Sequence, residues 1–157
     1  MRDFDSNGLR LAEFQGKLFE NSCEKFDCST SVFIRRFYYS NLLKELDKND
    51  SSVISLDVNQ GLESIKSQFG ESKYGKIKKN KDSLFWVGYF YRYISYTRNV
   101  STRFLMKTFK YEKLFELYYV YHTQDMEWCL NNLLELYNFD EKLFDKNYRL
   151  KEVIKKQ

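Results

Sequence analysis

The chain of 157 residues carries 26 basic and 22 acidic side chains, giving a formal net charge of +4, and 18% of its residues are aromatic. Its hydrophobic content of 43% excludes an intrinsically disordered chain, and its length is enough to bury a core without metals or disulfides. The positive charge is too small and too dispersed to indicate a nucleic-acid-binding protein by itself. We therefore expect one domain spanning residues 1–157.

Cysteine and histidine usage points away from a metal site. Cys23, Cys28 and Cys129 have no paired ligand spacing, and the single histidine cannot complete a zinc pattern. We expect reduced thiols, no metal and no cofactor. The N-terminal stretch contains acids and no apolar core, which is not typical of a signal peptide, and the longest charge-free run near residues 83–91 is shorter than the ~20 residues of a membrane helix. We predict a cytoplasmic protein with no membrane partner.

Helical periodicity dominates the first third of the chain. Apolar residues at three–four spacing after a capping residue, Ser6 or Asn7, predict a helix over 8–25. Gly16 within it either permits a close helix crossing or marks an irregularity. A capping cluster at 29–31 predicts a second helix over 31–47. It contains the pair Arg35 and Arg36, either solvated or a basic contact for a partner.

The middle of the chain is less regular. Residues 48–52 predict a turn, and residues 53–58 predict either a short strand or an irregular lead into a helix over 60–69. Residues 70–81 contain two glycines and five lysines without an apolar face, which predicts a loop. Its lysines either contact phosphates or an acidic partner, or form a solvated, mobile loop.

The most aromatic stretch, residues 82–98, contains seven aromatic residues among the twelve from Phe85 to Tyr96. Strand alternation and helical spacing both fit, but the length favours a helix, capped by Asp82 or Ser83. A helix that is apolar nearly all round is a central helix. So much ring area must be buried, in the chain's own core or against a partner. The aromatic residues of this stretch that we single out as binding candidates are Trp86, Tyr89, Tyr91 and Tyr93.

Arg92 is the one charged residue in that window. A buried arginine needs a carboxylate or several carbonyl groups, because leaving it unpaired costs several kcal/mol. We expect either a structural ion pair or a functional contact.

The region after Asn99 predicts a series of short helices. Val100 and Ser101 fit a hydrophobic staple and an N-cap for a helix over 102–109. A further helix over 112–121 follows it. This arrangement superficially resembles a helix-turn-helix, and it makes DNA binding an alternative function. Few polar side chains of the helix over 102–109 could read DNA bases, and these readers are Arg103, Lys107 and Thr108.

The only histidine, His122, precedes the next predicted helix. Thr123 is a natural cap for that helix, and Asp125 suits its first turn. We expect His122 to hydrogen-bond backbone carbonyls or a tyrosine. The only constellation for an enzyme acting on a nucleotide or ADP-ribose is His122, Arg92 and Asp125, and spacing supplies no nucleophile or partner acid. A last helix starts near Asp140.

Several short stretches of the chain resemble a family of small, uncharacterised bacterial proteins. The members of this family are encoded in toxin–antitoxin-like cassettes, beside a protein with an ADP-ribosyltransferase-like domain. The resemblance covers residues 9–134. The chain departs from the family at Ile94, where the family has tryptophan, and after Thr123, where it has Leu-Asp-Pro. The matching residues are Ala12-Glu13-Phe14-Gln15-Gly16-Lys17, Phe19-Glu20, Phe33-Ile34, Phe37, Phe85-Trp86-Val87-Gly88-Tyr89, Tyr91-Arg92-Tyr93, Ser101 and His122-Thr123-Gln124-Asp125.

The sequence thus predicts an all-α, or nearly all-α, domain of six to eight helices around residues 82–98, with one short strand as an option. The resemblance implies a cassette component, most simply an antitoxin-type module that binds a cognate toxin or another cassette protein. Promoter DNA and a second copy of the chain are the other partners we consider. The candidate binding residues are Trp86, Tyr89, Tyr91, Arg92, Tyr93, His122, Thr123 and Asp125.

Overall fold

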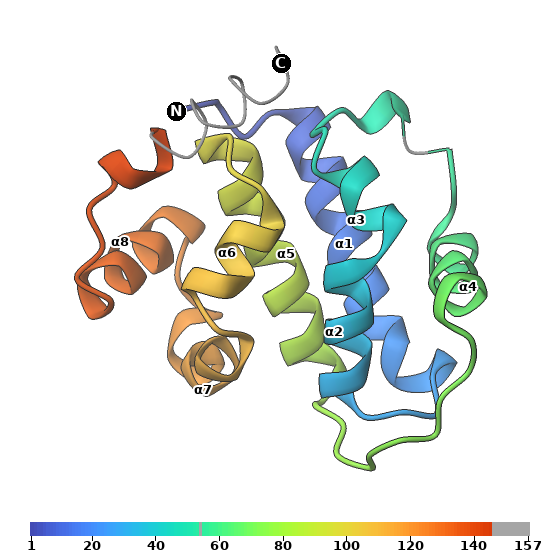
Figure 1. Ribbon diagram of the computed structural model, residues 1–157. Coiled ribbons are helices and arrows are strands. Elements are labelled where there is room, and N and C mark those ends of the chain that lie inside the picture. The colour runs from blue at the N-terminus through green and yellow to red at the C-terminus, as the bar shows by residue number, and fades with distance from the viewer. Residues whose placement is uncertain (54, 146–157) are drawn as a thin grey trace.

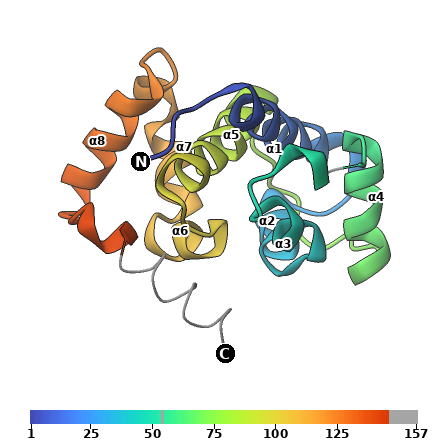
Figure 2. The same cartoon turned by 90° about the horizontal axis from the view of Figure 1, so that it is seen from above.

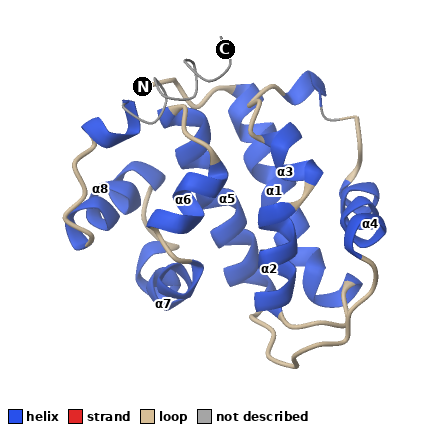
Figure 3. Cartoon of the chain, viewed as in Figure 1, coloured by secondary structure: helices blue, strands red, loops and turns tan. Residues whose placement is uncertain are grey.

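The computed structural model of the protein describes residues 1–53 and 55–145, and within those ranges it is built from helices with no strand (Figures 1 and 3). This confirms the all-α prediction. Residues 142–145 are helical as well. The labelled elements are α1 (Ser6–Lys25), α2 (Thr30–Tyr39), α3 (Asn41–Leu46), the 3-10 turn η1 (Ser51–Val53), α4 (Val58–Phe69), α5 (Lys81–Arg98), α6 (Thr102–Thr108), α7 (Tyr111–Tyr121) and α8 (Met126–Leu136).

Helix α5 lies at the centre of the molecule. It buries 14 of its 18 residues, and its contact with α1 is the most extensive between any two helices. Helices α1 to α4 lie on one side of α5 and helices α6 to α8 lie on the other (Figures 1 and 2). The buried apolar side chains of both sides form one contiguous cluster. The prediction of a central aromatic helix is therefore confirmed.

Two glycines allow α1 and α5 to approach closely. A Cβ atom on Gly88 would lie 2.8 Å from the backbone oxygen of Gln15, and one on Gly16 would lie 2.8 Å from the ring of Phe85. The side-chain amide of Gln15 donates to the carbonyl oxygen of Gly88 at 2.9 Å across the same crossing. The close crossing that Gly16 permits is one of the two alternatives we considered for that residue.

The prediction of a single helix over 31–47 is wrong, because the helix is interrupted at Ser40. Its backbone is extended there, with φ −74° and ψ 151°. The Ser40 hydroxyl donates to the carbonyl of Phe37 at 2.7 Å and accepts from the backbone N–H of Leu43 at 3.1 Å. This side chain replaces helical hydrogen bonds with its own, so it ends α2 and caps α3.

The optional strand over 53–58 is also absent from the described residues. The chain forms η1, and residues 55–57 belong to neither a helix nor a strand, so they form an irregular lead into α4. Asp57 and Gln60 form a capping box, with distances of 2.8 and 2.9 Å between their side chains and the reciprocal backbone N–H groups. This box starts α4 at Val58, two residues earlier than predicted.

The predicted helix caps are partly correct. Ser101 caps α6 as expected, accepting from the backbone of Phe104 at 3.1 Å. The observed caps of three other helices are Asp5 instead of Ser6 or Asn7, Asn80 instead of Asp82 or Ser83, and Asp125 instead of Thr123.

Residues 70–80 form the predicted loop. The last predicted helix is seen at 142–145, and the remainder of that prediction lies outside the described residues. Within the described chain, none of the helices has the length and apolarity needed to cross a membrane.

We expect Gly88→Ala to lower the free energy of unfolding by about 1–3 kcal/mol, because the new methyl group would meet backbone that cannot move aside alone. The matched control is Gly61→Ala in α4, whose Cβ would meet the flexible end of Leu18 at 3.0 Å. There the helix propensity of alanine offsets the crowding. Urea unfolding measures both variants, and equal stabilities would contradict the close crossing.

Candidate functional site

The predicted site residues fall into two groups, one on α5 and one at the turn between α7 and α8. On α5 the structure buries most of them, and Tyr89 is half-buried. At the turn, the three predicted residues are all exposed: His122, Thr123 and Asp125. The aromatic stretch is thus largely core. The buried members of the α5 group are Trp86, Tyr91, Arg92 and Tyr93.

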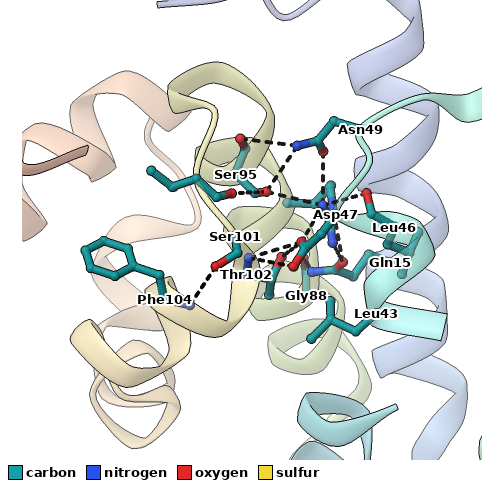
Figure 4. A network of polar contacts seen from close by, with 12 residues as sticks. Gln15, Leu43, Leu46, Asp47, Asn49, Gly88, Ser95, Ser101, Thr102 and Phe104 are labelled. Carbon is teal, nitrogen blue, oxygen red and sulfur yellow. Dashed lines mark hydrogen bonds and ion pairs between the residues drawn. The ribbon is translucent and has the colours of Figure 1, made fainter. Parts of the chain in front are cut away.

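Arg92 has no exposed surface, and its guanidinium donates to a network of polar groups. Figure 4 labels its partners Gln15, Leu46, Asp47 and Asn49. Its Nε and Nη2 atoms donate to Oε1 of Gln15 at 3.0 and 2.8 Å. Its Nη1 atom donates to the carbonyl oxygen of Leu46 at 2.9 Å, to Asp47 at 3.1 Å and to Asn49 at 3.0 Å. Burial lowers the pKa of Arg92, and the nearby carboxylate of Asp47 opposes that shift. Of the two roles that we considered for Arg92, the structural ion pair is present, with Asp47.

Asp47 links this network to the start of α6. Its carboxylate accepts from the backbone N–H of Thr102 at 3.1 Å and from the Thr102 hydroxyl at 2.8 Å. The Ser95 hydroxyl also contacts the guanidinium and donates to the carbonyl of Val100 at 2.6 Å. The buried charge therefore holds together residues from α1, the end of α3, α5 and the α5–α6 turn.

The buried tyrosines of α5 position the C-terminal helices. The Tyr91 hydroxyl donates to the carbonyl of Phe109 at 2.6 Å. The Tyr93 hydroxyl donates to Glu127 at 2.5 Å, and the same carboxylate accepts from Arg98 at 2.9 and 2.7 Å. Burial, followed by the Glu127 carboxylate, raises the pKa of Tyr93, while the hydrogen bonds from Arg98 lower the pKa of Glu127. These contacts fix α8 against α5.

The exposed side chains at the turn between α7 and α8 form a surface that we call the α7–α8 corner. Tyr119 is 76% exposed and Trp128 is 37% exposed, which are large values for aromatic residues. Such rings offer apolar area at low entropic cost, together with a polar tip that can hydrogen-bond. The corner consists of Tyr119, Val120, His122, Thr123 and Trp128.

His122 is held in place within the corner. Its Nδ1 atom lies 2.8 Å from the carbonyl oxygen of Tyr118, and its ring stacks on the Tyr118 ring with centroids 4.6 Å apart. This confirms the contacts expected for the histidine. Asp125 accepts from the backbone N–H of Trp128 at 2.8 Å, so it caps the helix that carries the tryptophan.

The corner rests on the aromatic core through Trp86. The Trp86 ring makes edge contacts with Tyr118 and Tyr121, at centroid distances of 6.1 and 6.2 Å. The Tyr121 ring in turn lies 5.5 Å from that of Trp128. The indole N–H of Trp86 is buried and finds no acceptor among the described residues, so ring packing rather than a hydrogen bond places it. The aromatic rings of α5, α7 and α8 thus form one layer that runs from the core to the surface.

The structure does not assemble the proposed enzymatic constellation. The guanidinium of Arg92 is enclosed by Gln15, Asp47 and Asn49, whereas His122 and Asp125 lie exposed at the corner. Burial raises the pKa of Cys129 to about 11, which keeps it a thiol at neutral pH. In residues 1–53 and 55–145, no cluster of histidine, cysteine and carboxylate side chains could hold a metal ion.

Sequence reasoning missed Tyr119, Val120 and Trp128 as surface residues. A signal for Trp128 was present, because the apolar stripe of its helix runs through Cys129, Leu130, Leu133 and Leu134. A tryptophan outside that stripe faces away from the core. For Tyr119 the aromatic run 118–121 obscured which ring would be outermost.

Comparison with known proteins found no match to the chain among protein-family models, curated proteins or solved structures.

We expect Asp47→Ala to lower the free energy of unfolding by about 3–5 kcal/mol, because the charge of Arg92 would stay buried without its carboxylate. The matched control is Glu45→Ala, which removes an exposed pair with Lys48 and should cost under about 1 kcal/mol. Chemical denaturation measures both. Similar losses in the two variants would show that the buried ion pair does not anchor the fold.

A pH dependence follows from Glu127. Its folded pKa lies below the ordinary value of 4.5, so its ionised form stabilises the fold above that pH and the contribution is lost as pH falls through the folded pKa. We expect Glu127→Gln to be less stable than the natural chain at pH 7, with the difference closing below pH 4.5. Thermal unfolding across this range tests it. Glu116→Gln, in an exposed pair with Lys113, is the control and should change little at any pH.

Proposed function

We propose that the protein is a non-enzymatic interaction module, an antitoxin-type component of a bacterial toxin–antitoxin cassette that binds its cognate toxin through the α7–α8 corner. The observation that carries this proposal is the exposure of Tyr119 and Trp128 on helices that contacts with α5 hold in place. Tryptophan, tyrosine and arginine supply most of the binding energy in protein interfaces.

The rigidity of the corner supports its use in binding. Trp128 lies in the first turn of α8, which Asp125 caps, and the two residues that follow it, Cys129 and Leu130, are fully buried. His122 is stacked and hydrogen-bonded before any partner arrives. Side chains that are already ordered lose less conformational entropy on association, so more of their contact energy appears as affinity.

The resemblance supports the cassette setting. Its C-terminal matching residues, from His122 to Asp125, lie within or beside the corner, and its aromatic stretch on α5 supports the corner from below. Under this proposal the departure at Gln124 to Met126 alters the part of the surface that would distinguish one cognate toxin from another.

The test is co-purification of the protein with the product of each adjacent gene, with complex mass read by light scattering. We expect one stable complex. Tyr119→Ala and Trp128→Ala should each weaken it about 30-fold or more, the loss typical of an interface hot spot. Tyr74→Ala is the matched control, because Tyr74 is 79% exposed but lies in the loop before α5. Circular dichroism verifies that each variant is folded.

Two outcomes would contradict the proposal in different ways. A well-folded protein with no affinity for any neighbouring gene product would remove the antitoxin function. A stable complex that tolerates both corner substitutions would keep the function and place the interface elsewhere.

A further inference from the structure

A groove of about 710 Å³ lies between α2, the loop 70–80 and the α6–α7 turn, and the corner residues are not among those that line it. Four tyrosines line it. Two of them are strongly exposed, Tyr39 at 55% and Tyr74 at 79%. The other two, Tyr38 and Tyr111, are half-buried. Of the aliphatic lining residues, Ile34 and Met106 are buried and Val32 is half-buried, so what the groove exposes is mainly tyrosine ring.

Tyr74 is exposed on an anchored backbone. Its carbonyl oxygen accepts from the backbone N–H of Ser29 at 3.0 Å, and that of Ile77 accepts from Thr30 at 3.0 Å. Between them Gly75 has φ +78°, and a Cβ there would meet the side chain of Ser29 at 2.7 Å. The loop is therefore docked on the start of α2, and it holds the Tyr74 ring out at the groove.

Three cations surround these rings. Arg35 comes from α2, Lys107 from α6 and Lys110 from the α6–α7 turn, and all three are exposed. None of them forms an ion pair with a described residue. Glu112 is the one carboxylate among the described lining residues. The groove thus has a positive balance, which favours an anionic ligand.

We propose that this tyrosine–cation groove binds single-stranded nucleic acid. Bases stack on the rings of Tyr39 and Tyr74, and phosphates lie against Arg35, Lys107 and Lys110. Exposed aromatic rings within a positively charged groove are the features by which proteins bind single strands without reading their sequence. The proposal does not depend on the antitoxin function, since it uses other residues.

The structure favours a single strand over a duplex. Of the readers expected on α6, Arg103 donates to the carbonyl of Tyr38 at 2.8 Å and Thr108 donates to that of Phe104 at 2.8 Å. These side chains serve the fold and are not free to contact base edges in a major groove. It also favours a nucleic acid over an acidic peptide, because the groove presents flat rings rather than an aliphatic socket for an anchor side chain.

The test uses a fluorescently labelled oligothymidylate of about 12 nucleotides, with binding read by anisotropy between about 50 and 200 mM salt. Three phosphate contacts predict a slope of log affinity against log salt of about −2. Tyr39→Ala and Tyr74→Ala should each weaken binding about 5- to 100-fold, the loss of one stacked base. Lys107→Ala and Lys110→Ala should each reduce the slope by about 0.7.

The matched controls are Tyr119→Ala, an equally exposed tyrosine outside the groove, and Lys17→Ala, an exposed cation on α1. Both should leave oligothymidylate affinity within about twofold of the natural chain, since neither residue lines the groove.

Three results would overturn the proposal. The first is no binding of oligothymidylate at the lowest salt concentration. The second is binding that Tyr119→Ala weakens as much as Tyr74→Ala. The third is tighter binding of polyglutamate or of a duplex of equal charge, which would assign the groove to an acidic protein segment or to phosphate contacts alone. A failure here leaves the toxin-binding test untouched, because that test depends on Tyr119 and Trp128.

Discussion

The charge of Arg92, buried at the centre of the molecule, constrains everything around it. Burying an arginine in apolar surroundings costs several kcal/mol unless its N–H donors are satisfied. Its planar guanidinium group donates hydrogen bonds only in fixed directions. The partners come from distant parts of the chain, with Gln15 on α1 and Asp47 and Asn49 after α3. These elements cannot shift along α5 without leaving that charge unpaired.

Helix α5, which carries Arg92, also positions the helices that bear the exposed aromatic residues. Tyr91 and Tyr93 use their hydroxyl groups to hold the end of α6 and the start of α8, and Trp86 supports α7 by ring contacts. Because α5 is fixed on one side by the Arg92 network, the helices attached to its other side inherit a defined position. The exposed rings of the corner are therefore presented by a rigid support, which is what a preorganised interface requires.

The sequence predicted the parts of this structure that depend on local pattern. Residues 82–98 were identified as a central helix because no polar face was available to leave in water. The need of Arg92 for a carboxylate was predictable, but its identity was not, because Asp47 is 45 residues away and chain spacing carries no information on such a pairing. The break at Ser40 was missed because one hydroxyl outweighed a continuous helical periodicity. In the run 118–121 it is Tyr118, not Tyr119, that packs against Trp86, and a local pattern does not specify which ring faces the core.

Helix α7 joins the two surfaces to which we assign binding. Tyr111 at its start lines the groove, and Tyr119 near its end belongs to the corner. The two are eight residues apart, which is about 12 Å along the axis and about 80° around it. A standard protein interface buries about 800 Å² on each partner, equivalent to a disc of roughly 16 Å radius. A partner centred on the corner would therefore extend along α7 towards the groove, so a protein bound at one surface and a strand bound at the other would lie close enough to contact each other.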